Sequence, residues 1–311
     1  MSATASPSSS SAMMGQRFWA GFAMAIVGAI LFSSKAIVAK LTYRYGVDAL
    51  VVIGFRMMLS APFFFVIAAW QAWSAHKGRQ VRLSGKDAFN VAFLGCMGYY
   101  LSSYLDFMGL QYISAGLERL ILFLAPTFVL LITAFWLKRP IGGRQWLALV
   151  LSYTGVVLVF AQDLSLGGAN VMLGSSFVLA AAVTYALYLI ASGELVKRIG
   201  ATRLVAYAMT VSSIATIIHF FGVHTWDGLR KVPEVYQLSL IHAVLQTVFP
   251  VFLTMWAVAR IGAPLTAQLG MIGPVSVLFL AGWILDEPIT LMHLLGTAVV
   301  LIGLMVLSRK P

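Results

Sequence analysis

The sequence predicts an all-α integral membrane protein whose ten transmembrane helices form two inverted five-helix repeats. Three observations support this fold class: the composition, the recurrence of long apolar stretches, and an internal repeat. Of the 311 residues, 60% are hydrophobic and only 10% are charged, which leaves too little polar surface for a soluble domain of this length. We expect the repeats at residues 16–163 and 164–311, after a disordered cytoplasmic tail, Ser-rich and uncharged, over residues 1–15.

Apolar stretches of about 20 residues, the length that a helix needs to cross the hydrocarbon, recur along the whole chain. They are separated by loops rich in Gly, Pro and charged residues, such as "HKGRQVRLSGK" and "KRPIGGR", which are typical helix breakers. The predicted spans are 18–39, 48–72, 87–109, 115–137, 145–162, 170–193, 203–222, 236–259, 264–285 and 290–308.

The charges predict an orientation. If the N-terminus is cytoplasmic, the residues on that side are Arg17, Lys77, Arg79, Arg82, Lys86, Lys138, Arg139, Arg144, Lys197, Arg198, Arg203, Arg260, Arg309 and Lys310. The opposite side keeps only Lys40, Arg44, Arg230 and Lys231. This positive-inside bias predicts a multi-pass protein of the inner (plasma) membrane with both termini in the cytoplasm. It also accounts for the net charge of +11 without nucleic acid binding.

The second half of the chain resembles the first at an offset of 148 residues. Pro126 then matches Pro274, and Gly155 matches Gly303. The matched turns read "LKRPI" (Leu137–Ile141) and "LDEPI" (Leu285–Ile289), so one is basic and the other acidic. Because each unit has an odd number of spans, the second unit enters the membrane upside down, as in the inverted repeats of secondary transporters.

These features resemble the EamA-type permeases of the drug/metabolite transporter superfamily. The resemblance covers residues 17–308 and rests on the two five-helix units, the Arg in "GFRMML", the Pro in the middle of spans 4 and 9, and "EP" before a Gly-containing last helix. It implies a substrate cavity between spans 1, 3, 4, 6, 8 and 9, in a family that exports amino acids and related metabolites. The family commonly has an acidic residue at the turn after span 4. Here the second repeat keeps it as Glu287, whereas the first has Arg139.

Charged residues near the membrane are the first candidates for function. Arg56 lies eight residues after Asp48, roughly 12 Å below the outer edge of its helix, and is the deepest predicted charge. It either ties helices together by pairing with a carboxylate or contacts a solute directly. Lys35 lies near the outer end of span 1, where we expect its side chain to snorkel to the interface.

Three further charges, Asp106, Glu118 and Arg119, flank the short turn between spans 3 and 4. We expect them to gather near Arg56, either as a network that fastens three helices or as an outer gate or protonatable coupling site. Pro126 and Pro274 are predicted to kink their helices, because each removes a backbone hydrogen bond. They act either as hinges or as static kinks that shape a cavity.

Polar and aromatic side chains inside the predicted spans are candidates for a substrate cavity. Small hydroxyl residues also serve helix packing alone, and that alternative stays open. The predicted cavity residues are Ser34, Tyr99, Ser103, Tyr185, Tyr188, Gln246 and Gln268.

The leading prediction is a secondary transporter that moves small metabolites or amino acids by alternating access, with export as the expected direction. The alternatives are an exporter of drugs or other xenobiotics and a non-transporting membrane scaffold. We predict no enzyme and no catalytic residue, because "HExxH", "GxSxG" and paired intramembrane acids are missing. With Cys96 the sole cysteine, we expect no metal site and no cofactor. The expected partners are a small-molecule solute and the lipid bilayer, not nucleic acid, and a monomer is compatible with this arrangement.

Overall fold

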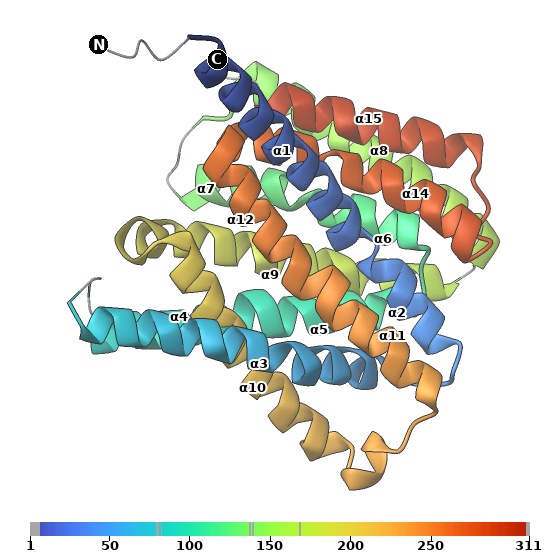
Figure 1. Cartoon of the computed structure of the whole chain (residues 1–311). Coiled ribbons are helices and arrows are strands. Elements are labelled where there is room, and N and C mark those ends of the chain that lie inside the picture. Colours follow the sequence, from blue (N-terminus) through green and yellow to red (C-terminus); the bar gives the residue numbers. More distant parts are fainter. Residues whose placement is uncertain are drawn as a thin grey trace.

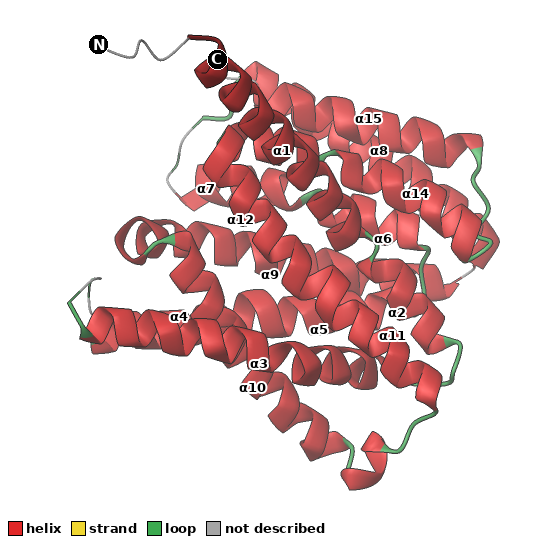
Figure 2. Ribbon diagram, viewed as in Figure 1, coloured by secondary structure: helices red, strands yellow, loops and turns green. Residues whose placement is uncertain are grey.

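The structure is a computed structural model that describes residues 7–78, 81, 83–136, 138, 140–167 and 169–308. Over these residues the chain forms helices and connecting loops, without strands (Figure 2). Two π-helical turns, η1 (Gly95–Leu101) and η3 (Val244–Val248), and one 3-10 turn, η2 (Trp226–Leu229), accompany the α-helices. The α-helices are α1 (Pro7–Ser33), α2 (Lys35–Tyr43), α3 (Ala49–His76), α4 (Gly85–Leu94), α5 (Ser102–Leu110), α6 (Ala115–Leu122), α7 (Ala125–Trp136), α8 (Gly143–Gly167), α9 (Ala169–Ile199), α10 (Ala201–Val223), α11 (Pro233–Ala243), α12 (Phe249–Ile261), α13 (Ala263–Gly270), α14 (Ile272–Ile284) and α15 (Leu291–Ser308).

Nine helical segments of the described chain are long and apolar enough to cross a membrane, so the chain is a multi-pass membrane protein. The predicted span 87–109 is not among them, although α4, η1 and α5 follow one another directly from Gly85 to Leu110. Its Asn90 and its Tyr and Ser residues between 99 and 104 make it less apolar. The tenth span therefore stays a prediction. The nine segments are Gln16–Tyr43, Ala49–His76, Ala115–Trp136, Gly143–Leu166, Asn170–Gly193, Ala201–Val223, Pro233–Ile261, Leu265–Ile284 and Leu291–Ser308.

The two ends of the described chain, the start of α1 and the end of α15, lie on the same side of the bundle (Figure 1). The predicted count of ten spans, being even, would place the two ends in this way. Helix α1 begins at Pro7, within the predicted tail of residues 1–15, and residues 1–6 lie outside the described part. Some residues used to predict the orientation and the matched turns also lie outside it, namely Arg79, Arg82, Leu137, Arg139, Arg309 and Lys310.

Interruptions of the helices recur at the offset of 148 residues. The π-helical turn η1 in the first half matches η3 in the second. The turn at Phe123, between α6 and α7, matches the turn at Met271, between α13 and α14. Lys138 and Asp286, one offset apart, both have a positive φ, 50° and 60°, which is uncommon outside glycine. The two halves thus share local geometry as well as sequence, and the opposite orientation of the halves stays a proposal.

Four pairs of helices pack across the two halves: α8 with α15, α3 with α10, α1 with α12, and α5 with α9 (Figure 1). A shift of 148 residues places α1 on α9 and α5 on α12. The pair α1–α12 in one direction therefore corresponds to the pair α9–α5 in the other. Glycines allow the backbones to approach closely. A Cβ atom added to Gly155 would lie 2.5 Å from the carbonyl oxygen of Gly296, and one added to Gly109 would lie 2.5 Å from that of Gly174.

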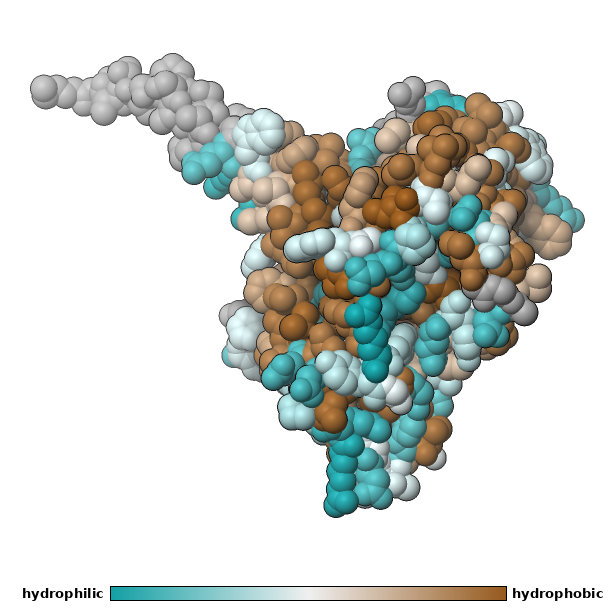
Figure 3. Space-filling view, turned by 90° about the vertical axis from the view of Figure 1, so that its right-hand side faces the viewer, coloured by the Kyte–Doolittle hydropathy of each residue, from teal (hydrophilic) through white to brown (hydrophobic). Residues whose placement is uncertain are grey.

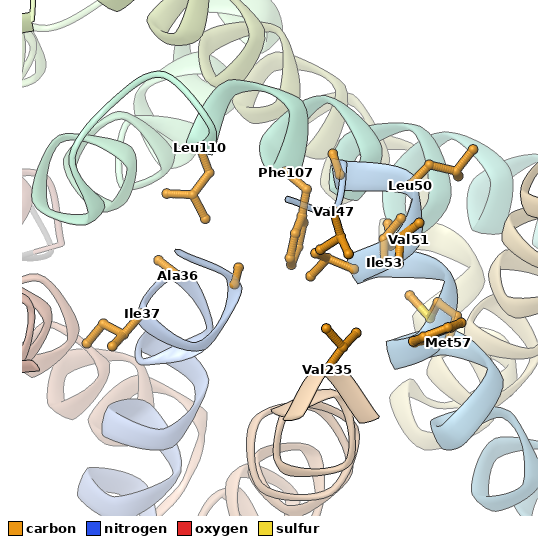
Figure 4. Close-up of a cluster of buried hydrophobic side chains, with 14 of the residues drawn as sticks. Ala36, Ile37, Val47, Leu50, Val51, Ile53, Met57, Phe107, Leu110 and Val235 are labelled. Atoms are coloured by element: carbon orange, nitrogen blue, oxygen red, sulfur yellow. The ribbon is translucent and has the colours of Figure 1, made fainter. Parts of the chain in front are cut away.

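An apolar core closes the end of the bundle opposite the chain termini, which we call the α2 end. There α2, the start of α3, α5 and the start of α11 bring together Ile37, Ile53, Phe107 and Val235, all at most 2% exposed (Figure 4). The phenol of Tyr43 donates a hydrogen bond of 2.8 Å to the carbonyl oxygen of Phe107. This core fixes the position of Phe107, whose ring lies against the charged residues described below.

The outside of the bundle carries many large apolar side chains. Phe135, Trp136 and Trp283 are 88%, 71% and 81% exposed, and apolar residues cover much of the face shown in Figure 3. Such a surface is unfavourable in water and suits contact with lipid. Helices are the form that lipid permits, because they pair most of their backbone polar groups internally.

Candidate functional site

A cavity of about 230 Å³ lies between helices of both halves of the chain. Four charged side chains line it: Lys35, Arg56, Asp106 and Arg119. Spans 1, 3, 4, 6 and 8 contribute to the wall, as the family resemblance implied. Span 9 does not, whereas α3 and α10 contribute Arg56, Met57 and Met209. The other lining residues are Phe32, Gly98, Tyr99, Ser102, Ser103, Leu122, Phe123, Ala182, Tyr185, Gln246, Thr247 and Val251.

Four of the predicted cavity residues line this cavity, namely Tyr99, Ser103, Tyr185 and Gln246. The other three do not. The side-chain amide of Gln246 donates to both the carbonyl oxygen and the hydroxyl of Ser34, at 3.1 Å each, in the turn between α1 and α2.

Tyr188 lies behind the wall, 4% exposed, where its hydroxyl donates to the hydroxyl of Tyr99 at 3.4 Å and its ring stacks on Tyr185. Gln268 is exposed on α13, away from the cavity. The period of an apolar helix does not reveal which of its faces meets lipid, so these two residues could not be placed from the sequence.

Lys35 is buried, and the prediction that it snorkels to the interface was wrong. Its side chain forms an ion pair with Asp106 and lies 3.6 Å from Glu118. The physical reason is the length of the first span, which continues through α2 to Tyr43, beyond the predicted end at residue 39. Lys35 therefore stands about 12 Å, or eight residues, inside the end of the helix.

Glu118 and Arg119 are also buried, 0% and 6% exposed, in the first two turns of α6. Arg119 donates a hydrogen bond of 2.7 Å from Nη2 to the hydroxyl of Ser33. Lys35, Asp106, Glu118 and Arg119 thus connect α1, α2, α5 and α6, which agrees with the predicted gathering of charges. We call these four residues and Arg56 the charge cluster.

Arg56 joins the charge cluster without an ion pair to any residue in the described part of the chain. Its guanidinium lies over the ring of Phe107, 4.9 Å from the centroid, and its Nε and Nη2 atoms are buried without a hydrogen-bond partner. The predicted tie to a carboxylate on a neighbouring helix is therefore not formed. Arg56 instead faces the cavity.

Aromatic rings separate the three cations of the charge cluster. Phe32 contacts Arg119 and Lys35, with ring centroids 5.3 and 5.9 Å from the two cationic groups. Phe107 contacts Lys35 and Arg56 in the same way, at 5.7 and 4.9 Å. A cation held over an aromatic face is stabilised by the ring quadrupole, although less than by a carboxylate. Within this arrangement Nε and Nη2 of Arg56 and Nε of Arg119 have no hydrogen-bond partner.

A second group of contacts joins the two halves at the α2 end. Lys40 donates a hydrogen bond of 2.5 Å to Glu287, which lies in the turn between α14 and α15. Glu287 also accepts from the backbone amide of Ala115 at 3.0 Å, where the partial positive charge of a helix N-terminus favours a carboxylate. We call these three residues the seal.

Next to the seal, Asp163 of α8 accepts a hydrogen bond of 2.5 Å from Ser114 and contacts Nε2 of His293, on α15, at 2.9 Å. These contacts line a second cavity of about 280 Å³. The sequence did not predict the seal or this neighbouring contact. The sequence contained a signal for the seal. Lys40 and Glu287 carry opposite charges, and each follows the end of a predicted span on the same side of the membrane.

A duplicated helical membrane bundle with a charged cavity between its halves is the architecture of a membrane transporter. The chain belongs to the EamA-like transporter family, which matches it twice, at residues 19–161 and 172–309. The two matches correspond to the two halves that share sequence and helix interruptions.

Individual relatives agree with this family. The chain is 32% identical over 288 residues to the uncharacterized transporter YcbK of Bacillus subtilis (strain 168), with 89% of each protein covered. It is 24% identical to the uncharacterized transporter YetK of the same organism, over 93% of this chain and 85% of that protein. A crystal structure with a TM-score of 0.61 and 14% identity covers 94% of this chain and 96% of that one, which shows a shared fold.

Proposed function

We propose that this protein is a secondary carrier that moves a small metabolite or amino acid across the inner membrane by alternating access, with export as its direction. The observation that carries the proposal is the cavity, because both halves of the chain contribute to its wall. A solute bound there contacts both halves, so movement of one half against the other changes the side from which the solute is reached.

The seal supports a closed state at the α2 end. Glu287 of the second half holds Lys40 and Ala115 of the first half, and opening at this end must break both contacts. Ala115 begins α6, the helix that also carries Glu118 and Arg119. If Glu287 releases the amide of Ala115, any movement of α6 also moves Glu118 and Arg119 of the charge cluster.

The helix interruptions supply places where such a movement can occur. Leu122 and Phe123 line the cavity and lie at the turn that precedes Pro126. Pro126 and Pro274 stand in the first turns of α7 and α14, directly after α6 and α13. Having no backbone N–H, neither can continue the hydrogen bonding of the preceding helix across the interruption, as an internal residue of one unbroken helix would. We propose that the two turns are hinges.

Counterflow with purified protein in proteoliposomes tests the proposed function. Vesicles loaded with a panel of amino acids and small metabolites are diluted into the same labelled solutes, and we expect transient accumulation of at least one of them. Glu287→Gln, which weakens the seal, should change the rate of this exchange.

The alternatives give different results. Exchange confined to drugs or dyes would indicate the export of xenobiotics. Exchange of none of the solutes by well-folded, correctly inserted protein would favour a scaffold and contradict the proposal.

A further inference from the structure

We propose that the cavity binds a solute with one anionic group, a carboxylate, and that Arg56 and Arg119 hold this group while the aromatic wall contacts an apolar body. This inference rests on the proposed function and specifies the chemical class of its substrate. It follows from the charge balance, the unused hydrogen-bond donors and the lining of the cavity.

The charge cluster has an excess of positive charge. With every group ionised, it contains three cations, Lys35, Arg56 and Arg119, and two anions, Asp106 and Glu118. Protonation of either carboxyl group increases the excess. All five side chains belong to residues at most 8% exposed, and buried charges are stable only when they are compensated. An anion in the cavity would supply the missing negative charge.

The contacts of Lys35 decide which cations remain available. Lys35 forms the ion pair with Asp106 and lies 3.6 Å from Glu118, whereas neither arginine forms an ion pair with these two carboxylates in the described part of the chain. Arg119 uses Nη2 for Ser33, while its Nε has no partner. Arg56 has no partner at Nε and Nη2. Both arginines line the cavity, and guanidinium groups match the geometry of carboxylates.

The rest of the wall indicates the other end of the solute. Tyr99, Tyr185, Phe123, Met57 and Met209 present rings and flexible apolar chains to the cavity, and such surfaces contact an apolar or aromatic body. The volume of about 230 Å³ limits the solute to a small molecule.

Three probes with the same phenyl body separate the possible head groups: 3-phenylpropanoate carries only a carboxylate, phenylalanine a carboxylate and an ammonium, and 2-phenylethylamine only an ammonium. We expect the first to raise the melting temperature of the purified protein in detergent, and the amine to leave it unchanged. Phenylalanine reports whether the site tolerates an ammonium beside the carboxylate. Binding of phenylalanine together with the acid supports the proposal. A shift with the amine equal to that with the acid, or no shift with either carboxylate, overturns it.

Variants assign the effect to the arginines. Arg56→Gln and Arg119→Gln should each weaken binding of 3-phenylpropanoate about tenfold or more, the cost of losing a hydrogen bond to a charged group. Arg56→Lys should retain part of the affinity, which separates loss of charge from loss of fold. The matched control is Arg230→Gln, on a loop where the Arg230 side chain is 86% exposed. Unchanged affinity in both glutamine variants overturns the assignment.

The binding readout and the transport readout fail independently. Selective binding of carboxylates without any counterflow leaves the anion site intact and contradicts the proposed function. Counterflow of neutral or cationic solutes, without binding of carboxylates, leaves the transporter intact and contradicts the anion site.

Discussion

The carboxylate of Glu287 accepts a hydrogen bond of 3.0 Å from the backbone amide of Ala115, so a turn of the second half caps a helix of the first. The same carboxylate accepts from Lys40 at 2.5 Å. One acidic side chain therefore fastens α2, α6 and the turn between α14 and α15 at the α2 end. In the proposed alternating-access mechanism, these contacts must break before that end can open.

Glu287→Gln should open the α2 end. The amide loses the ion pair with Lys40 and its charge at the N-terminus of α6, so we expect a shift of about tenfold toward the open state. A reporter cysteine at Ser103, in a Cys96→Ala background, measures the opening through its reaction with an impermeant thiol reagent. Asp227→Asn, in the 3-10 turn η2 where the side chain is exposed, is the matched control. An unchanged reaction rate would show that the seal does not limit access.

Pro126→Ala and Pro274→Ala test the hinges. Alanine restores the backbone N–H that proline lacks and favours a straighter helix. We expect each variant to bias the accessibility of the Ser103 reporter toward one side of the membrane. Pro233→Ala, at the first position of α11, serves as the control because no helical hydrogen bond is missing there. Equal accessibility in all variants would indicate static kinks.

Gly273→Ala should disturb the charge cluster from the second half of the chain. A Cβ atom at this position would stand 2.4 Å from the hydroxyl of Ser33 and 3.4 Å from Nη2 of Arg119. Overpacking of this kind costs ~1–3 kcal/mol, which should appear as a lower melting temperature.

Two further variants check the origin of this effect. Ser33→Ala in combination with Gly273→Ala should restore part of the loss, because it removes the nearest clashing atom. Gly270→Ala should have little effect, since nothing lies within 4 Å of a Cβ atom there. Because alanine favours a helix over glycine, a loss of equal size at Gly270 would mean that the contact with Ser33 is not the cause.

Lys35→Met should be the most destabilising single change in the charge cluster. It leaves Asp106 and Glu118 buried and without their cation, and breaking a buried ion pair costs ~3–5 kcal/mol. Lys35→Arg, which keeps the charge, should cost less, and Asp106→Asn should recover part of the loss when combined with Lys35→Met. Thermal unfolding in detergent measures all three, and a double variant no more stable than Lys35→Met would contradict the pairing.

Glu118→Gln tests whether transport is coupled to protons. Glu118 is fully buried, and neither of its oxygens has a hydrogen-bond partner, so a change of its protonation would alter the charge of the cluster by one unit. We expect the variant to exchange solute with a flatter dependence on pH than the unmodified protein. A pH profile identical to that of the unmodified protein would assign Glu118 to fastening alone.

Much of the architecture could be predicted because membrane helices need long apolar stretches and prolines interrupt them in a known way. The matched Pro126 and Pro274 predicted the paired interruptions, and the charges around the turn after α5 predicted where a cluster would form. The sequence indicated Arg56 as a deep charge, and the residue is buried in the bundle, but its guanidinium lies over the ring of Phe107 and not beside a carboxylate.

The remaining features depend on information that a linear pattern does not contain. Lys35 was misplaced because the end of an apolar stretch does not fix the end of its helix, and α2 continues to Tyr43. Gln268 faces outward because the rotation of α13 is set by its neighbours. Lys40 and Glu287 meet only when the two halves pack together, so their pairing is a property of the tertiary structure.

The two halves have diverged in a complementary way since they arose as copies of one unit. Where the first half has Glu118 and Arg119, the second has Thr266 and Ala267, and where the second has Gly273, the first has Ala125. One copy provides the charges and the other provides the space beside them. A chimera built from two first halves would crowd its own arginines, and one built from two second halves would have none of these charges. Each half has become the specialised complement of the other, while the matched prolines and glycines and the helix interruptions keep the symmetry of the repeat.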